Sequence, residues 1–226
     1  MEQRKRIAIY GGTFDPVHAA HLAIARRVLE LFDIDEFLFV PAWLAPHKMD
    51  REVSRALHRY AMLALATQAD ERLYVSTFEL DAPGRQFTVD TLAYFRARFG
   101  ESAEIFFVMG ADSWLEITTW REWRRLMSLA NLIVVTRPGY EITITQVGPE
   151  VAQNVVDLRK PASKNPGTAG AGSRKVFLTD AVMLEVSASE IRRAASDDGE
   201  KLDRLVPPEV AEYIRKYQLY RNTNNA

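Results

Sequence analysis

The sequence of 226 residues contains no cysteine. This absence excludes a disulfide framework, a thiolate metal site and a cysteine nucleophile. A surplus of one charge is absent too, because 29 Lys and Arg stand against 30 Asp and Glu, for a formal net charge of −1 at pH 7. That balance argues against bulk binding of nucleic acid through a basic surface, so affinity for phosphate must come from a few placed cations.

Long hydrophobic runs are also missing. The most apolar stretch, residues 37–46, is about ten residues long and is interrupted by Pro41, whereas a membrane-spanning helix needs roughly 18 apolar residues. Before the first glycine pair, the N-terminal segment has only four consecutive apolar residues, Ile7–Tyr10, which are too few for a secretory signal. We therefore expect a cytoplasmic protein that contacts no membrane.

What the sequence does contain is a regular alternation of two patterns. Short runs of β-branched and aromatic residues predict strands at Arg6–Tyr10, Glu36–Val40, Leu73–Phe78, Glu104–Met109, Leu132–Thr136, Val176–Leu178 and Val182–Val186. Helical periodicity predicts helices at Ala19–Phe32, Ser54–Gln68, Thr88–Phe99, Ser187 to about Ala195, and Glu209–Tyr220. Continuous apolar strands alternating with helices are typical of an α/β fold with a doubly wound parallel sheet, here followed by a small C-terminal helical part.

The chain is predicted to form a single domain over residues 1–226. Residues 160–175 are rich in Pro, Gly, Ala and Ser and have no hydrophobic period, which indicates a flexible loop. We place this loop inside the domain, because the strands that follow it are needed by the same sheet. The sequence leaves open whether copies of the chain form a homo-oligomer.

The strongest candidate for chemistry directly follows the first predicted strand, in the segment GGTFDPVHAAH at residues 11–21. Gly11 and Gly12 let a ligand approach the backbone, and a helix start offers N–H groups and a positive dipole end to phosphate. His18 and His21 are three residues apart, so both imidazoles lie on one face of an exposed first turn. The segment lacks the third glycine of a dinucleotide-binding motif and the GK[ST] of a P-loop. A plain surface histidine pair is the alternative, which the position after a strand and two glycines disfavours.

Further segments of the sequence, which we call landmarks, make the functional interpretation of this segment more specific. GGTFDPVHxxH resembles the signature of nucleotidyltransferases that carry an HxGH motif. Seven further segments are similar to those of bacterial nicotinate-mononucleotide adenylyltransferases and follow in the same order: Pro46-His47-Lys48, Glu79-Leu80-Asp81, Gln86 to Leu92, Gly110 to Ser113, Thr119-Trp120, Arg137 to Tyr140, and Val186 to Arg192. The resemblance covers nearly the whole chain and implies a Rossmann-like nucleotidyltransferase fold.

The resemblance implies an enzyme of NAD biosynthesis that transfers the adenylyl group of ATP to nicotinate mononucleotide and releases pyrophosphate. The catalytic residues would be His18, His21 and Arg192. The ATP phosphates would be contacted by Gly11, Gly12, Thr13, Phe14, Lys48, Ser187 and Ser189. The mononucleotide would be bound by Phe87, Thr88, Gly110, Asp112, Trp120 and Arg137. No carboxylate cluster offers a protein cage for a metal, so Mg²⁺ is expected only on the ATP phosphates and water.

Within the mononucleotide set, Trp120 would stack on the pyridine ring, and backbone N–H groups near Phe87 and Thr88 would receive the ring carboxylate. Ordinary structural roles are open for the same residues. Trp120 could belong to the core, Thr88 could be a helix cap, and Arg137 could be a turn residue with an ion pair.

Three residues depart from the family pattern: Ala20 replaces a glycine, Phe87 a tyrosine and Ala188 a hydroxyl residue. The alternatives in function are a nicotinamide-mononucleotide adenylyltransferase, a phosphopantetheine adenylyltransferase, or a nucleotide-binding module without catalysis. Phosphopantetheine adenylyltransferase shares the first motif but lacks the landmarks at Thr88 and Trp120. The presence of both histidines and Arg192 favours an enzyme, since binding alone does not need all three.

Overall fold

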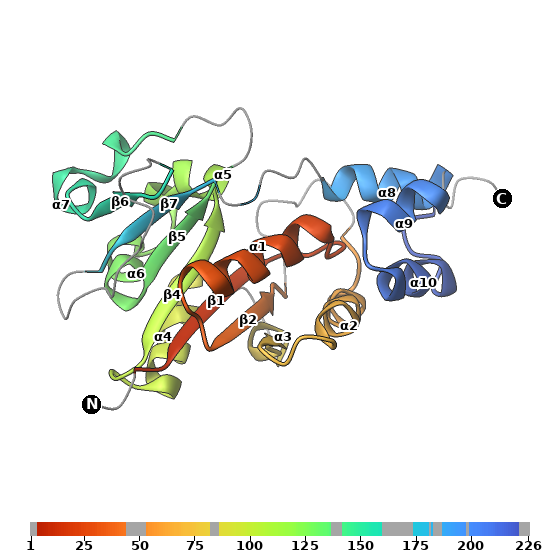
Figure 1. Cartoon of the computed structure of the whole chain (residues 1–226), viewed down its shortest axis with the longest axis horizontal. Coiled ribbons are helices and arrows are strands. Elements are labelled where there is room, and N and C mark those ends of the chain that lie inside the picture. Colours follow the sequence, from red (N-terminus) through yellow and green to blue (C-terminus); the bar gives the residue numbers. More distant parts are fainter. Residues whose placement is uncertain are drawn as a thin grey trace.

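The structure is a computed structural model that describes residues 4–43, 53–81, 86–136, 142–159, 174–180, 182, 187–197 and 199–221. Its centre is one sheet in which every pair of neighbouring strands is parallel (Figure 1). Across the sheet the strands are β3 (Leu73–Val75), β2 (Glu36–Pro41), β1 (Arg6–Gly12), β4 (Glu104–Gly110), β5 (Asn131–Val135), β7 (Val176–Thr179) and β6 (Val155–Asp157). The predicted parallel sheet is therefore confirmed.

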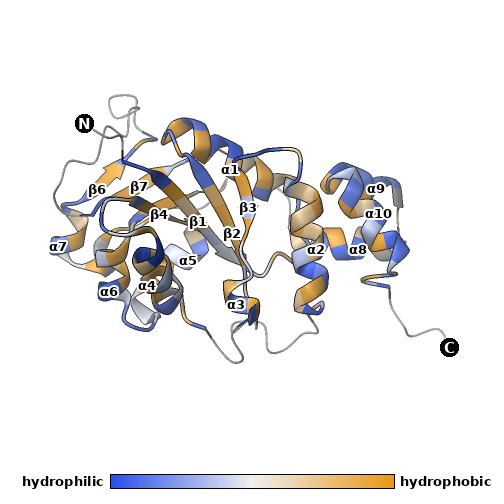
Figure 2. Cartoon of the chain, turned by 90° about the horizontal axis from the view of Figure 1, so that it is seen from below, coloured by the Kyte–Doolittle hydropathy of each residue, from blue (hydrophilic) through white to orange (hydrophobic). Residues whose placement is uncertain are grey.

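Helices lie on both faces of the sheet. They are α1 (Ala19–Leu31), α2 (Ala56–Thr67), α3 (Phe78–Asp81), α4 (Thr88–Phe99), α5 (Ala111–Leu115), α6 (Trp123–Leu129), α7 (Pro149–Ala152), α8 (Ala188–Asp197), α9 (Gly199–Leu205) and α10 (Pro208–Lys216), with 3₁₀ turns η1 (Ile117–Thr119) and η2 (Thr145–Val147). Figure 2 shows α1 on one side of the strands and α4, α5 and α6 on the other. This is the doubly wound arrangement that the sequence predicted.

Two hydrophobic clusters explain why the strands are apolar throughout. On β1, Ala8 and Tyr10 belong to the cluster that contains the buried face of α1, whereas Ile7 and Ile9 belong to the cluster that contains Leu92 of α4. Successive residues of a strand point to opposite faces, and here both faces are covered. In Figure 2 the strands accordingly carry hydrophobic residues along most of their length.

The C-terminal helices α8, α9 and α10 lie together at one end of the molecule, next to α2 (Figures 1 and 2). Their buried residues Ile191, Leu202 and Ile214 belong to the same cluster as β1 and α1. A hydrogen bond of 2.9 Å joins His58 Nδ1 on α2 to the Tyr213 hydroxyl on α10. The shared hydrophobic cluster and this hydrogen bond favour a single domain. A single domain over residues 1–226 stays our proposal.

The third strand is shorter than predicted. It was expected to continue to Phe78, but β3 ends at Val75 and α3 begins at Phe78. Ser76 Oγ accepts a hydrogen bond of 3.2 Å from the backbone N–H of Phe78. A serine that bonds the backbone two residues further on offers the chain a turn in place of the sheet ladder, which ends the strand.

The last helix also ends earlier than predicted. α10 stops at Lys216, not at Tyr220, and the backbone of Gln218 and Tyr220 has positive φ values of 54° and 66°. The N–H of Leu219 donates to the carbonyl of Ile214 at 3.0 Å, which closes the turn. Tyr220 is thereby directed back toward the rest of the molecule.

Some predicted elements lie outside the described residues. These are residues 183–186 of the expected late strand and residues 160–173 of the expected loop; residues 174–175 are described and lead into β7. Several short elements were not predicted, namely β6, α3, α5, α6, α7, α9 and the 3₁₀ turns η1 and η2. No helix within the described part of the chain is long and apolar enough to cross a membrane.

Candidate active site

The site begins where β1 and β4 end side by side. The two strands are neighbours in the sheet, with Tyr10 paired to Val108. The helix after β1 covers one face of the sheet, and the residues of α5 and α6 after β4 belong to the cluster on the other face. Such a reversal leaves a crevice at the carboxyl ends of the strands, where open α/β sheets bind ligands.

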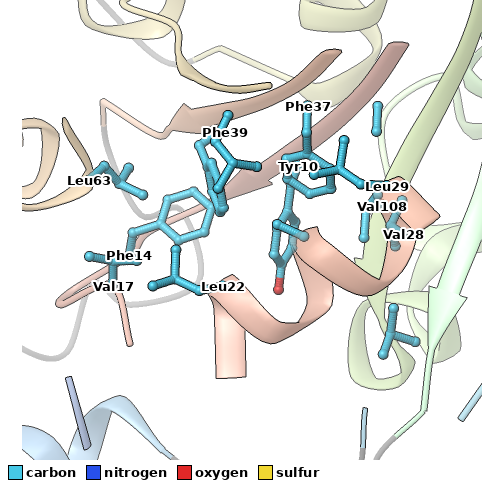
Figure 3. Packing of buried hydrophobic residues seen from close by; sticks show 14 of the residues in the cluster. Tyr10, Phe14, Val17, Leu22, Val28, Leu29, Phe37, Phe39, Leu63 and Val108 are labelled. Carbon is cyan, nitrogen blue, oxygen red and sulfur yellow. The ribbon is translucent and has the colours of Figure 1, made fainter. Parts of the chain in front are cut away.

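The turn after β1 is held by an aromatic contact. A Cβ atom on Gly12 would lie 2.9 Å from the ring of Phe14, so only glycine fits below that ring. Phe14 has a positive φ of 49°, is 3% exposed, and packs edge-on against Tyr10 and Phe39. Figure 3 shows its ring beside Leu22 of α1. Phe14 thus anchors the turn in the core through its side chain, and a contact between Phe14 and ATP stays a prediction.

His18 and His21 form a stacked pair at the start of α1. Their ring centroids are 3.7 Å apart, with 28° between the ring planes. His18 is 4% exposed, so the expectation that both histidines are exposed is wrong for His18, whereas His21 is half-buried. The ring of Phe14 packs edge-on against His21 at 5.0 Å, which covers part of the pair.

A hydrogen bond fixes the orientation of the second histidine. The backbone N–H of His18 donates to His21 Nδ1 at 3.3 Å. When Nδ1 accepts, a neutral imidazole carries its proton on Nε2. His21 can therefore donate from Nε2 to a phosphate oxygen.

Ala20 lies between the two histidines. It is 7% exposed and belongs to the buried core. Its methyl group therefore packs within the protein, and the replacement of a glycine here is accommodated by packing.

Arg192 of α8 lies against the same loop. Its Nη1 donates to the carbonyl oxygen of Asp15 at 2.8 Å, and its Nη2 donates to Ser189 Oγ at 2.8 Å. Ser187 caps the start of this helix, because the N–H of Glu190 donates to Ser187 Oγ at 3.1 Å. Two residues 177 positions apart in the sequence, Asp15 and Arg192, therefore meet, and Asp15 lies three residues before His18.

A buried arginine that the sequence analysis did not select supports this loop. Arg59 of α2 is 1% exposed, and its guanidinium donates to the carbonyls of Thr13 at 2.7 Å, Ala42 at 2.7 Å and Ser54 at 2.9 Å. Burial lowers the pKa of Arg59, and the nearby Asp15 carboxylate opposes that shift. Arg59 thus ties the turn after β1 to the segment after β2.

Two residues predicted to bind the mononucleotide, Gly110 and Asp112, lie at the end of β4 and just after it. Gly110 is the N-cap of α5, and Asp112 is an exposed acid in the first turn of that helix. A Cβ atom on Gly110 would lie 2.5 Å from Asp112 Oδ1, so the carboxylate folds back over the glycine. Asp112 lies two residues beyond the carboxyl end of β4, the strand that neighbours β1.

The residues predicted for the pyridine ring gather on the α4 face. Phe87 is the N-cap of α4 and Thr88 its first residue. The guanidinium of Arg121 lies 4.8 Å from the centre of the Phe87 ring, which brings the segment of Trp120 to the start of α4. Trp120 is half-buried and packs edge-on against Phe107 of β4. Trp120 therefore has core contacts on one side while it borders the helix start.

Other residues of this region have structural roles. Trp114 is fully buried, and its Nε1 donates to the carbonyl of Thr143 at 3.0 Å. Thr91 Oγ1 donates to Glu79 Oε1 at 2.7 Å, and burial raises the pKa of the Glu79 carboxyl group. Glu79 belongs to a family landmark, and its contact joins α3 to the first turn of α4.

Two predicted residues, Lys48 and Arg137, lie outside the described residues. Among the residues that are described, no three His, Asp or Glu side chains gather in a way that could hold a metal ion. We call the segment between β1 and α1, residues 13–18, the Asp15 loop. The residues that the structure brings together at this loop are His18, His21, Ser189 and Arg192.

A parallel sheet with an imidazole pair after its first strand, and an arginine from a distant helix on the loop that leads into that pair, fits an α/β enzyme that binds phosphates at the carboxyl ends of its strands. The cytidylyltransferase-like family model matches residues 9–194. The chain belongs to the nicotinate-nucleotide adenylyltransferases of the cytidylyltransferase-like family.

The relatives match over nearly their whole length. A probable nicotinate-nucleotide adenylyltransferase of Thermoanaerobacter sp. (strain X514) is 35% identical over 98% of this chain and 97% of that protein. One of Chromobacterium violaceum is 38% identical over 96% and 99%. Among solved structures, Plasmodium falciparum nicotinic acid mononucleotide adenylyltransferase complexed with NaAD is 22% identical, has a TM-score of 0.71, and is matched over 96% of this chain and 97% of that chain. This last likeness shows that the fold is shared.

Proposed function

We propose that this chain transfers the adenylyl group of ATP to nicotinate mononucleotide, forming nicotinate adenine dinucleotide and pyrophosphate, as a cytoplasmic step of NAD biosynthesis. The observation that carries the proposal is the hydrogen bond of 2.8 Å from Arg192 to the Asp15 carbonyl. It brings a guanidinium to the loop that leads into the histidine pair. The names of the relatives, matched over the full chain, support the same reaction.

The reaction needs positioning and stabilisation of charge. An oxygen of the mononucleotide 5′-phosphate attacks the α-phosphorus of ATP, and the bond from that phosphorus to the bridging oxygen breaks, so that pyrophosphate leaves with the bonding electrons. Such transfers depend on in-line placement and on donors aimed at the phosphate oxygens. His18 and His21 would donate to the α-phosphate, and the guanidinium of Arg192 would hold the leaving pyrophosphate.

The remaining substrate contacts follow from the same arrangement. ATP would enter as its Mg²⁺ complex, with the metal ion held by phosphates and water. Gly11, Gly12 and the start of α8 at Ser187 would offer backbone N–H groups to the phosphates. At the other end, Trp120 would stack on the pyridine ring, the start of α4 would receive its carboxylate, and Asp112 would accept from a ribose hydroxyl.

The test is a pyrophosphate-release assay with ATP and each of three acceptors. We expect the fastest release with nicotinate mononucleotide, a slower one with nicotinamide mononucleotide, and none above background with phosphopantetheine. Fastest release with phosphopantetheine would assign the chain to that sister activity. Binding of ATP without release for any acceptor would identify a nucleotide-binding module without catalysis.

The choice between the two pyridine nucleotides gives a quantitative prediction. A charged acceptor that receives N–H groups gains roughly 1.5–3 kcal/mol from its hydrogen bonds, and a helix start adds roughly 0.3–1 kcal/mol. The carboxamide would turn its own NH₂ toward those donors. We therefore expect kcat/KM to favour nicotinate mononucleotide about tenfold or more, on the order of 2 kcal/mol. Equal values would show that the start of α4 does not read the ring substituent.

The role of Trp120 can be separated from that preference. Stacking does not distinguish a carboxylate from a carboxamide, so Trp120→Ala should lower kcat/KM for both mononucleotides by a similar factor. Trp123→Ala, at the start of α6, removes a neighbouring indole that contacts Arg124 and should leave both values near those of the parent. Loss of the preference itself in Trp120→Ala would contradict a pure stacking role.

Arg192→Lys tests the guanidinium while keeping the charge. Lysine cannot bond Ser189 and the Asp15 carbonyl through one planar group, and each lost bond to a charged donor costs roughly 1.5–3 kcal/mol. We expect kcat/KM for ATP to fall about tenfold or more. Arg193→Lys, at an exposed position on the same helix, is the matched control and should behave like the parent. If both variants kept the parent value, Arg192 would have a purely structural role.

A further inference from the structure

The end of the chain returns to the loop that leads into the histidine pair. Beyond α10 the backbone turns at Gln218 and Tyr220, and the Tyr220 hydroxyl donates a hydrogen bond of 2.7 Å to Asp15 Oδ1. The two residues are 205 positions apart in the sequence. Asp15, which accepts this bond, lies three residues before His18 in the sequence.

Asp15 connects this contact to the phosphate site. Its side chain is 2% exposed, and its carboxylate also accepts a bond of 3.4 Å from the N–H of Ser54. Its carbonyl oxygen accepts from Arg192 Nη1 at 2.8 Å. One buried residue therefore holds Tyr220 through its side chain and Arg192 through its backbone.

A second bond attaches Tyr220 to the helix that carries Arg192. Ser196 Oγ donates to the Tyr220 carbonyl at 2.6 Å, and Ser196 lies about one turn after Arg192 on α8. The contacts thus close into a ring from Asp15 to Arg192, along α8 to Ser196, and through Tyr220 back to Asp15. A movement of Arg192 relative to the loop that leads into the histidine pair would break one of these hydrogen bonds.

We propose that Tyr220 is a positioning residue for adenylyl transfer, which holds the Asp15 loop and α8 together so that the histidine pair and Arg192 face one triphosphate. The proposal rests on the proposed function. Geometry of this kind matters because a displacement of about 1 Å far from the reacting atoms can cost ~10²-fold in rate.

The chemistry of the contact suits a permanent attachment. Burial, and next the adjacent Asp15 carboxylate, raise the pKa of the Tyr220 hydroxyl above its usual range. The hydroxyl therefore stays protonated and remains a donor. It also donates to one oxygen of a buried carboxylate, whose other oxygen accepts from the N–H of Ser54.

The test compares two variants that each remove one tyrosine hydroxyl from the C-terminal part. Tyr220→Phe removes the bond to Asp15, and Tyr213→Phe removes the bond of 2.9 Å to His58 on α2. We expect kcat/KM for ATP to fall ~10- to ~100-fold in Tyr220→Phe, with KM for nicotinate mononucleotide unchanged. Tyr213→Phe should match the parent. Equal losses in both variants, or no loss in Tyr220→Phe, would overturn the proposal.

Two further measurements separate positioning from general stability. If Tyr220 acts through Arg192, the loss in the double variant Tyr220→Phe with Arg192→Lys is smaller than the product of the single losses. Independent, multiplying losses would contradict this. If Tyr220→Phe does not fold, Ser196→Ala removes the other attachment and should lower kcat/KM for ATP in the same direction; a parent value there would count against the proposal.

Binding of α,β-methylene ATP, measured by calorimetry, tests the contact without any transfer. We expect weaker binding in Tyr220→Phe than in the parent and in Tyr213→Phe. If the parent binds the analogue but transfers to no acceptor, the proposed function fails, and the analogue still decides the role of Tyr220. Equal affinities in the parent and Tyr220→Phe would overturn that role.

Discussion

We expect His18→Ala and His21→Ala each to lower kcat for adenylyl transfer by about 10²–10³, the usual cost of removing one donor that stabilises charge in a transition state. The two rings are stacked at the start of α1, and His21 can donate from Nε2. The measurement is pyrophosphate release at saturating ATP and nicotinate mononucleotide. His58→Ala, on α2, removes a histidine that bonds Tyr213 and should keep the parent kcat.

Folding must be checked in the same variants. His18 is buried, so His18→Ala leaves a small cavity, and a lower unfolding temperature is expected for it than for His21→Ala. Circular dichroism and thermal unfolding show whether each variant is folded at the assay temperature. A folded variant with the parent kcat would remove that histidine from the catalytic assignment.

Arg59→Met should lower the free energy of unfolding by about 3–5 kcal/mol. The substitution leaves the carbonyls of Thr13, Ala42 and Ser54 without their donor in a buried place. Urea unfolding, followed by circular dichroism, measures the difference. Activity should fall as well, because the turn after β1 loses its support.

Arg55→Met is the matched control for that substitution. Arg55 lies at the start of the same helix with an exposed side chain, so its loss should change stability by no more than about 0.5 kcal/mol. Similar urea midpoints for the Arg59 and Arg55 variants would show that the buried guanidinium does not hold the turn.

The sequence predicted helices and strands most accurately where the hydrophobic pattern and the residues that start or stop an element indicate the same bounds. The bounds of α4, Thr88–Phe99, match the expectation at both ends. At the C-terminal end the signal is clear, because the apolar stripe of the helix stops at Gly100. The C-terminal end of β3 was missed because local bonds of Ser76 compete with the sheet ladder. Such bonds depend on one or two side chains and leave the hydrophobic pattern unchanged.

Within the candidate site, spacing indicated the histidine pair but not its burial. His18 is buried where its ring stacks on His21, and Phe14 packs edge-on against His21 and Phe39, so this burial depends on packing between β1, β2 and α1. Arg59 did leave a signal, because it stands three and four residues before the buried Met62 and Leu63 on one face of α2. A cation on the apolar face of a helix indicates a buried partner.

The contact between Arg192 and the Asp15 loop was beyond sequence reasoning. It joins residues 177 positions apart and depends on how α8 packs against the first cluster. The return of Tyr220 to Asp15 was hidden for a similar reason. Helical periodicity continues to Tyr220, whereas the positive φ values that end the helix fall on Gln218 and Tyr220, which are not glycines.

The most direct test of adenylyl transfer follows the two ends of the triphosphate separately. The chain is incubated with nicotinate mononucleotide and ATP labelled with ³²P at either the α- or the γ-phosphate, and the products are separated by chromatography. We predict that the α label appears in nicotinate adenine dinucleotide and the γ label in pyrophosphate. Recovery of both labels in unreacted ATP, or transfer of the γ label to the mononucleotide, would contradict attack at the α-phosphorus.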